Sequence, residues 1–472
     1  MPVDSPLFLL AFLPVVLALY ALGPRFLREA LLLAASLLFY ALSSVGTLWF
    51  FVASMLGNLV LGLVIEKADG VWRKRLTALG VVANLGFLAW FKYLGFLAEI
   101  SGVGVLKSLE PHAMPLGISF FTFAAVAYLV DIGRGSAQAE KNPVRFCLFF
   151  AFFSKIAAGP IARHKDMAAG PKPLALEDVR AGLTRLSIGL AKKVFIAGAL
   201  APMANAAFGE RAGNLDVGTA WLGLVSYSLQ LYFDFAGYTD MAIGLGRVFG
   251  FRIPENFNYP YVSQSVREFW RRWHMTLSLW FRDYLYIPLG GGRVAPWKIQ
   301  RNLLIVFTLC GLWHGASLSF VIWGLWHGVF LSLERTRLGR AIDRLPKALR
   351  HGYAILAVML GWVFFRATDL AHAWEYFRAL AGLNSGGFEY TWMVRVSRMY
   401  MVMLVLGVLG AAQLLPWLCA RLANTRQGID QSAPPLGGIA MFARALLPPA
   451  LLALSLMQLA SGTYAPFIYA QF

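Results

Sequence analysis

Charged residues are scarce in this sequence, and their scarcity excludes an ordinary water-soluble protein. Asp, Glu, Lys and Arg make up only 14% of the 472 residues, while 58% are hydrophobic. Soluble globular domains carry about 25% charged residues. The charge is missing from long runs such as 77–98, which match the roughly 20 apolar residues that a helix needs to cross the bilayer core. The composition therefore predicts an integral membrane protein.

Several motifs are also missing, and each absence excludes a kind of site. The three cysteines are an odd number without a C-x-x-C pair, which excludes a disulfide framework and a zinc ribbon. No HExxH occurs, so we expect no metal site. Gly290–Gly292 is not followed by Lys-Ser/Thr, which excludes a P-loop. No G-x-S-x-G, Ser-x-x-Lys or paired-cysteine nucleophile is apparent, and this leaves histidine as the candidate catalytic group.

Apolar stretches with the length of a span or half-span follow one another along the chain. They lie near 6–23, 30–45, 47–66, 77–98, 115–132, 144–159, 184–208, 218–246, 302–333, 352–367, 398–418 and 441–460. Half-spans and hairpins would pass the same test, so we predict about ten to twelve crossings. The polar stretches between them are shorter than a folded domain. We therefore predict an all-α, polytopic fold with a single transmembrane domain, residues 1–472.

The net charge of +18 does not call for a nucleic-acid partner, and we predict none. Lys and Arg gather in short loops such as 73–75 and 335–340, which is the positive-inside pattern. Basic loops of this kind also attract anionic lipid head groups or an anionic cosubstrate. The pattern places the N-terminus outside the cytoplasm. It places loops 65–75, 134–145, 247–301 and 334–351 inside.

The segment 247–301 is too polar to cross the membrane, yet it is rich in aromatic residues. Arg271, Arg272 and Arg282 lie among these rings, a combination that suits the water–lipid interface. We predict that 247–301 lies on the cytoplasmic side, with a helix over 264–285 that lies in the surface or dips into it.

The pentapeptide GLWHG occurs twice in the apolar stretch 302–333, around His314 and His327. Ionisable groups inside a membrane are costly and mark function by default. His314 lies near the middle of the stretch, and we interpret it as a catalytic base. His327 lies near the charged end at Glu334, where helix packing is a sufficient explanation.

The spacing of these two histidines argues against a shared metal ion. They are 13 residues apart, which on one continuous helix puts them roughly 20 Å apart on nearly opposite faces. A break at Gly315 would alter that geometry. A neutral imidazole can still take a proton from a hydroxyl that attacks a thioester, and burial favours the neutral form. A covalent acyl-histidine is the alternative route.

Four further ionisable residues accompany these histidines. His274 is surrounded by arginines, and both interfacial anchoring and a place near the reaction centre are open for it. Asp234 and Tyr238 are four residues apart and share a helix face, while Asp240 points about 120° away from Asp234. These groups could bind a cation, orient a histidine or cap a broken helix.

Six long motifs carry a family resemblance over most of the chain. They are PLGISFFTF (115–123), AGPIARH (158–164), YFDFAGYTDMAIGLGRVFGFRIPENFNYPY (232–261), EFWRRWHMTLSLWFRDYLYIPLGG (268–291), GLWHGASLSFVIWGLWHG (311–328) and APFIYAQF (465–472). With these motifs the chain resembles the membrane-bound O-acyltransferase superfamily. Within it, the chain looks most like the bacterial branch of alginate O-acetyltransferase and the D-alanyl transfer protein of teichoic acid synthesis.

The resemblance implies a ring of tilted helices around a narrow central tunnel, with interfacial and re-entrant helices. His314 matches the essential histidine of the family's W-H-G motif, and His274 matches a second polar position. We expect the arginines of the interfacial segment to meet CoA phosphates or an acidic carrier protein. The residues expected to bind the donor or line the tunnel are Arg271, Arg272, Arg282, Asp234, Tyr238, Asp240, Trp313 and His327.

The function implied is the transfer of an acyl group, in the first instance acetyl, through a bacterial inner membrane that the chain crosses several times. The donor is a cytoplasmic thioester, acetyl-CoA or an acyl-carrier protein, and no cofactor is tightly bound. The acceptor is an extracytoplasmic polysaccharide such as alginate, with a periplasmic acetyltransferase partner completing the transfer. The alternatives are a D-alanyl or other acyl transferase, a non-enzymatic transporter or channel, and a passive scaffold.

Overall fold

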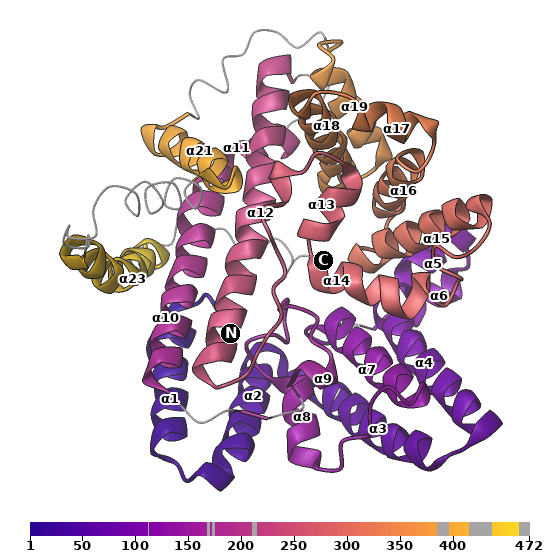
Figure 1. Ribbon diagram of the computed structural model, residues 1–472, viewed down its shortest axis with the longest axis vertical. Helices are drawn as coiled ribbons and strands as arrows, with labels where there is room; N and C mark the ends of the chain where they lie inside the picture. The colour runs from indigo at the N-terminus through magenta and orange to yellow at the C-terminus, as the bar shows by residue number, and fades with distance from the viewer. Residues whose placement is uncertain are drawn as a thin grey trace, which may run out of the picture. The chain divides into compact units, whose positions relative to one another are not determined.

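Every regular element in the described part of the chain is a helix (Figure 1). The computed structural model describes residues 1–111, 113–167, 170–171, 175–209, 215–384, 396–414 and 437–461, and for 437–444 the backbone alone. The tail motif 465–472 and the end of the predicted span 398–418 lie outside these ranges. The protein is an all-α, polytopic membrane protein, as its composition predicts.

The chain forms two compact units. The first contains 1–186, 239–255 and 282–284, and the second contains 187–238, 256–281 and 285–472. The polypeptide passes from one unit to the other within helices α10 and α12, as well as in the segments that follow α12. The organisation of residues 1–472 as one transmembrane domain stays a prediction.

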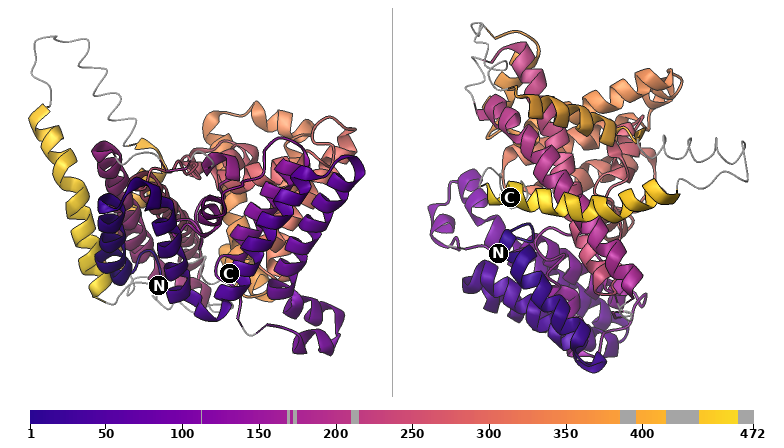
Figure 2. Two further views of the ribbon diagram at one scale, coloured as in Figure 1. Left: turned by 90° about the horizontal axis from the view of Figure 1, so that it is seen from below. Right: turned by 90° about the vertical axis from the view of Figure 1, so that its left-hand side faces the viewer.

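The first unit contains the N-terminal helices and the end of α12. Its helices are η1 (Phe8–Phe12), α1 (Leu13–Leu22), η2 (Arg25–Leu27), α2 (Arg28–Ser44), η3 (Val45–Thr47), α3 (Leu48–Lys67), α4 (Gly70–Lys92), α5 (Leu94–Ser101), α6 (Gly104–Ser108), α7 (Ile118–Gly133), α8 (Pro143–Ala151), α9 (His164–Met167) and most of α10 (Leu176–Ala191). Helices α3, α4 and α7 pack side by side (Figure 2). Buried Asn58 and Asn84 join α3 to α4 by exchanging amide hydrogen bonds of 3.0 and 2.8 Å.

The second unit contains all three histidines singled out by the sequence. Its helices are η4 (Lys192–Ala197), α11 (Gly198–Gly209), most of α12 (Val217–Val248), η6 (Pro260–Val262), α13 (Val266–Arg272), α14 (Met275–Phe281), η7 (Arg282–Tyr286, which begins in the first unit), α15 (Pro296–His314), α16 (Leu318–Leu333), α17 (Arg337–Asp343), α18 (Lys347–Arg366), α19 (Leu370–Leu380), α21 (Arg398–Ala411) and α23 (Gly437–Ala460).

In the part of the chain that the structure describes, three helical stretches are long and apolar enough to cross a membrane, and a bent pair, α4 with α5, would make a fourth. The same part contains five shorter apolar helices of 10–17 residues. Large apolar side chains cover the outside of several helices, with Leu22 on α1 87% exposed and Val405 on α21 52% exposed. Such surfaces suit lipid rather than water. The count of ten to twelve crossings stays a prediction.

The stretch predicted as the span 302–333 is a helical hairpin rather than one continuous helix. Helix α15 ends at His314, because Gly315 is extended (φ −163°, ψ 152°), and α16 begins three residues later after Ser317. A Cβ on Gly315 would lie 2.1 Å from the Phe320 ring, so a side chain at this position would have to displace that ring. His314 and His327 therefore lie on two different helices, and the spacing expected for one continuous helix does not apply.

Helices α15 and α16 pack against each other (Figure 1), and the first glycine of each GLWHG copy lies where their backbones come closest. A Cβ on Gly311 would lie 2.1 Å from the Phe320 carbonyl oxygen, and one on Gly324 would lie 2.1 Å from the Phe307 carbonyl oxygen. Small residues let helix backbones approach this closely inside membranes. These two glycines therefore serve helix packing rather than substrate access to an imidazole.

Replacing Gly324 with alanine is expected to destabilise the protein by about 1–3 kcal/mol, the usual cost of overpacking. The new methyl group would meet backbone atoms of α15, which cannot rotate away. Thermal unfolding in detergent, followed by intrinsic tryptophan fluorescence, measures the change. Gly86→Ala in α4 is the matched control, because nothing lies within 4 Å of its Cβ position. Equal melting temperatures for the two variants would contradict the close α15–α16 contact.

The single helix predicted over 264–285 is wrong, because the structure contains α13 and α14 with a break between them. Trp273 is extended (φ −99°, ψ 130°) and His274 adopts a left-handed φ of 41°. Two backbone hydrogen bonds join the segment before η6 to the residues on either side of this break. Asn258 N donates to Arg272 O at 2.9 Å, and Met275 N donates to Asn256 O at 2.9 Å. These long-range hydrogen bonds compensate the helix bonds that the break removes.

Candidate active site

His314 is the last residue of α15, and its side chain is enclosed by aromatic rings. Its ring centroid lies 4.9 Å from Trp313, 4.9 Å from Trp323 and 5.3 Å from Phe365, in edge-to-face arrangements. Only 4% of the residue is exposed. Burial of this kind disfavours the charged imidazolium, so the site suits a neutral base. A substrate that reaches this imidazole must pass or displace part of the aromatic wall.

His274 is fully buried in the break between α13 and α14. Its ring packs edge-on against Phe235 of α12 at 4.9 Å and against Trp313 at 6.0 Å. Trp313 therefore contacts both His274 and His314. The left-handed conformation of His274 is uncommon for a residue with a side chain, and strained positions of this kind cluster at functional sites.

His327 is also fully buried, which differs from the shallow position that its nearness to Glu334 in sequence indicates. Its ring lies 5.1 Å from Trp323 and 5.2 Å from Trp270. Neither ring nitrogen has a hydrogen-bond partner within the described residues. Because Trp323 also contacts His314, the hairpin brings both GLWHG histidines to the same indole ring.

Glu334 does not mark a water-exposed helix end, since it is only 8% exposed. Its carboxylate accepts the backbone N–H groups of Val266 and Arg267 at 2.6 and 3.0 Å. It therefore caps the first turn of α13, where an acidic group is favoured by the helix dipole. This contact ties the end of α16 to the helix that precedes His274.

The acidic residues of α12 have strong partners. Asp234 forms a buried ion pair with Lys193 of the π-helix η4, and both residues belong to the second unit. Tyr238 is 4% exposed, one turn further along α12. In the first unit, Asp240 accepts from Arg185 at 2.8 Å, and Arg185 also binds Glu255. The role of Asp234, Tyr238 and Asp240 as tunnel-lining residues stays a prediction.

Two of the three interfacial arginines already form ion pairs with carboxylates. Arg272 pairs with Glu268 at 2.9 Å, and Arg282 pairs with Asp283 at 2.6 Å. Arg271 is exposed. Burial raises the pKa of Asp283, but hydrogen bonds from Arg282 and Arg163 outweigh it and hold that pKa below its ordinary value. Of the three arginines, Arg271 is therefore the best placed to meet an added anion.

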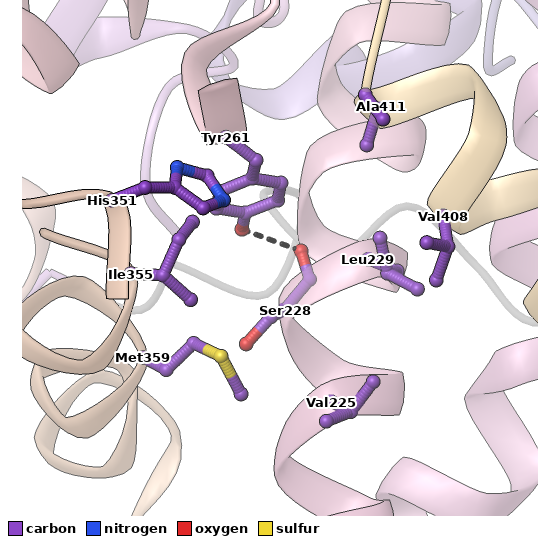
Figure 3. A pocket seen from close by; sticks show the side chains of 10 residues that line it. Val225, Ser228, Leu229, Tyr261, His351, Ile355, Met359, Val408 and Ala411 are labelled. Carbon is purple, nitrogen blue, oxygen red and sulfur yellow. Dashed lines mark hydrogen bonds between the residues drawn. The ribbon is translucent and has the colours of Figure 1, made fainter. Parts of the chain in front are cut away.

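An apolar cavity of about 200 Å³ is lined mainly by side chains of α12, α18 and α21 (Figure 3). Its lining residues are Val225, Ser228, Leu229, Tyr261, His351, Ile355, Met359, Val408, Ala411 and Ala412. Tyr261 forms part of its wall and donates a hydrogen bond to Ser228 O at 2.7 Å, while it accepts one from Trp362 at 3.2 Å. His314 does not line this cavity. Its lining is too apolar to recognise a sugar, and we assign no catalytic role to it.

Sequence reasoning missed Asn256 and Lys193. Asn256 is fully buried, and its Oδ1 lies within hydrogen-bond distance of Nδ1 of His274. In the sequence it follows Pro-Glu and resembles a turn residue. Lys193 carried a usable signal, because a lysine inside an apolar stretch needs an acidic partner. Within the described residues, no group of three or more His, Cys, Asp and Glu side chains could hold a metal ion.

The sequence that builds this site matches a known family. A sequence model of the membrane-bound O-acyltransferase family, MBOAT, matches residues 32–364. The chain is 40% identical, over 99% of both chains, to “Probable alginate O-acetylase AlgI” of Azotobacter vinelandii. It is 39% identical to “Peptidoglycan O-acetyltransferase” of Helicobacter pylori, over 81% of this chain and 80% of the relative.

A third relative, “Teichoic acid D-alanyltransferase” of Bacillus subtilis, is 31% identical over 44% of this chain and 58% of its own. The chain belongs to the membrane-bound O-acyltransferase family, which confirms the resemblance found in its motifs. It is an acyltransferase.

Proposed function

We propose that this protein passes an acetyl group from a cytoplasmic thioester through the membrane for O-acetylation of an extracytoplasmic polysaccharide. The observation that carries the proposal is the pair of buried histidines, His274 and His314, that both pack against Trp313. The relatives named as an O-acetylase and an O-acetyltransferase are 40% and 39% identical over 99% and 81% of this chain, while two relatives named as D-alanyltransferases are 31% and 29% identical over 44% and 66% of it. Acetyl is therefore favoured over D-alanyl.

His314 acts as the general base in this proposal. Its neutral imidazole takes the proton of an attacking hydroxyl while the hydroxyl oxygen forms a bond to the thioester carbonyl carbon. The carbon–sulfur bond then breaks, and the departing thiolate takes up the proton, so that an ester and a free thiol result. No metal or tightly bound cofactor is needed for this chemistry.

The donor is acetyl-CoA, with a carrier-protein thioester as the alternative. Arg271 at the exposed surface of α13 supplies positive charge for its phosphates. The protein lies in the lipid of a bacterial inner membrane, which its chain crosses about ten to twelve times. A periplasmic acetyltransferase partner accepts the acetyl group and completes transfer to a polymer such as alginate.

Purified protein in liposomes, supplied with radiolabelled acetyl-CoA, tests the proposal. The expected result is release of free CoA thiol together with label on an added alginate oligosaccharide or on the periplasmic partner. A D-alanyl carrier thioester, offered in parallel, should react more slowly. Label that crosses the bilayer as intact acetyl-CoA would support a transporter instead, and faster reaction of the carrier thioester would reverse the choice of donor.

A further inference from the structure

The side chain of Asn256 gathers three donors around one oxygen. Its Oδ1 lies 3.2 Å from the backbone nitrogen of Thr276, 2.9 Å from the Thr276 hydroxyl and 3.1 Å from Nδ1 of His274. Asn256 and His274 are both 0% exposed. The contacts join residues 18 and 20 positions apart in sequence, so they exist only because the chain breaks between α13 and α14.

The orientation of the Asn256 amide follows from its partners. Oxygen and nitrogen of an amide are assigned from the hydrogen-bond network, and the backbone N–H of Thr276 can only donate. The atom that faces it must therefore be the oxygen. The opposite orientation would turn the NH2 group of Asn256 toward the N–H of Thr276, so that two donors would face each other.

This orientation fixes the proton on His274. Because Oδ1 of Asn256 can only accept, Nδ1 of His274 must be the donor in their hydrogen bond. In a neutral imidazole the other nitrogen then carries the lone pair. Nε2 of His274 is buried and has no hydrogen-bond partner among the residues that the structure describes. It can accept a hydrogen bond or a proton, but a neutral ring cannot donate from it to a developing oxyanion.

We propose that Asn256 is a positioning residue that holds His274 as its Nδ1–H tautomer, so that Nε2 is a hydrogen-bond acceptor for a donor group of the acyl-accepting substrate other than the O–H whose proton His314 removes. The proposal rests on the acyl transfer proposed above. It assigns His274 to the hydroxyl substrate rather than to the thioester carbonyl. Stabilisation of the oxyanion must then come from other donors.

Nuclear magnetic resonance of ¹⁵N-histidine-labelled protein in nanodiscs tests the tautomer directly. Signals of His274 are assigned by difference from His274→Gln, and the protonated ring nitrogen is identified near neutral pH. We expect the proton on Nδ1. A proton on Nε2, or an equal mixture of tautomers, would overturn the proposal. This measurement does not depend on activity, so absence of acyl transfer would remove the proposed function without affecting the tautomer result.

Variants separate positioning from simple structural support. Asn256→Leu removes the acceptor and should give mixed tautomers, with kcat about 10–100-fold lower, by analogy with the loss of partners that orient metal-binding histidines. KM for acetyl-CoA should change little. Asn256→Asp keeps an acceptor and should keep the Nδ1–H form. Thr276→Val removes one donor from the same oxygen and should leave the tautomer unchanged.

A purely structural role for Asn256 makes different predictions for the same variants. It would lower the yield of folded protein in Asn256→Leu while His274 kept its proton on Nδ1, and that result would refute the proposal. If Asn256→Leu does not fold, wild-type protein and Asn256→Asp still decide the matter, because both must show the Nδ1–H form.

Discussion

Replacement of His314 by glutamine is expected to lower acyl transfer by about 10²–10⁴-fold, the usual contribution of a general base. Glutamine is polar and of similar size to histidine, so Trp313, Trp323 and Phe365 should still have a side chain to pack against. It cannot take up a proton at neutral pH. Release of CoA thiol from acetyl-CoA in liposomes measures the loss, and gel filtration in detergent reports whether the protein is folded.

His351→Gln is the matched control for this substitution. His351 is exposed at the start of α18, and its ring hydrogen-bonds only the carbonyl oxygen of Ser263, at 3.1 Å. A glutamine amide can donate to the same carbonyl, so activity should stay within a few fold of wild type. If His314→Gln retained wild-type activity, His314 could not be the base, and the chemistry would have to be sought at His274 or His327.

The predictable part of this fold followed from length and hydropathy, which are properties of single segments. Apolar stretches near 30–45, 47–66 and 352–367 correspond to α2, α3 and α18 with ends that shift by a few residues. Stretches of this kind become helices wherever lipid surrounds them, because every backbone polar group must be satisfied within the segment. Family membership was equally accessible, because its motifs are long and occur in order.

Breaks in helices could not be predicted in this way, because tertiary contacts decide them. The spacing of residues in α13 and α14 does not show the break at His274, which hydrogen bonds to Asn256 O and from Asn258 N compensate. At Gly315 the Phe320 ring lies where a side chain would be, and this contact is likewise invisible in the sequence. Depth measured along the chain failed for His327 for the same reason, since Trp270 of α13 packs against its ring and helps to bury it.

Loss of the buried ion pair between Lys193 and Asp234 should be the largest effect on stability. Both groups are almost completely buried, with side-chain exposures of 0% and 7%. Lys193→Met removes the cation and leaves a buried carboxylate without this partner, which typically costs about 3–5 kcal/mol. We expect a lower melting temperature and a lower yield of monodisperse protein in detergent. Denaturation followed by tryptophan fluorescence gives the free energy of unfolding.

The double variant Lys193→Met/Asp234→Leu separates a structural ion pair from a functional carboxylate. Replacing both charges with apolar groups is often nearly neutral, so most of the lost stability should return. The exposed pair Arg247–Asp178 is the control, because breaking a surface pair costs only about 0–1 kcal/mol. A double variant that is stable but inactive would place Asp234 on the path of the acyl group. A double variant that is both stable and active would show that Asp234 only joins η4 to α12. The predicted tunnel would then have to run elsewhere.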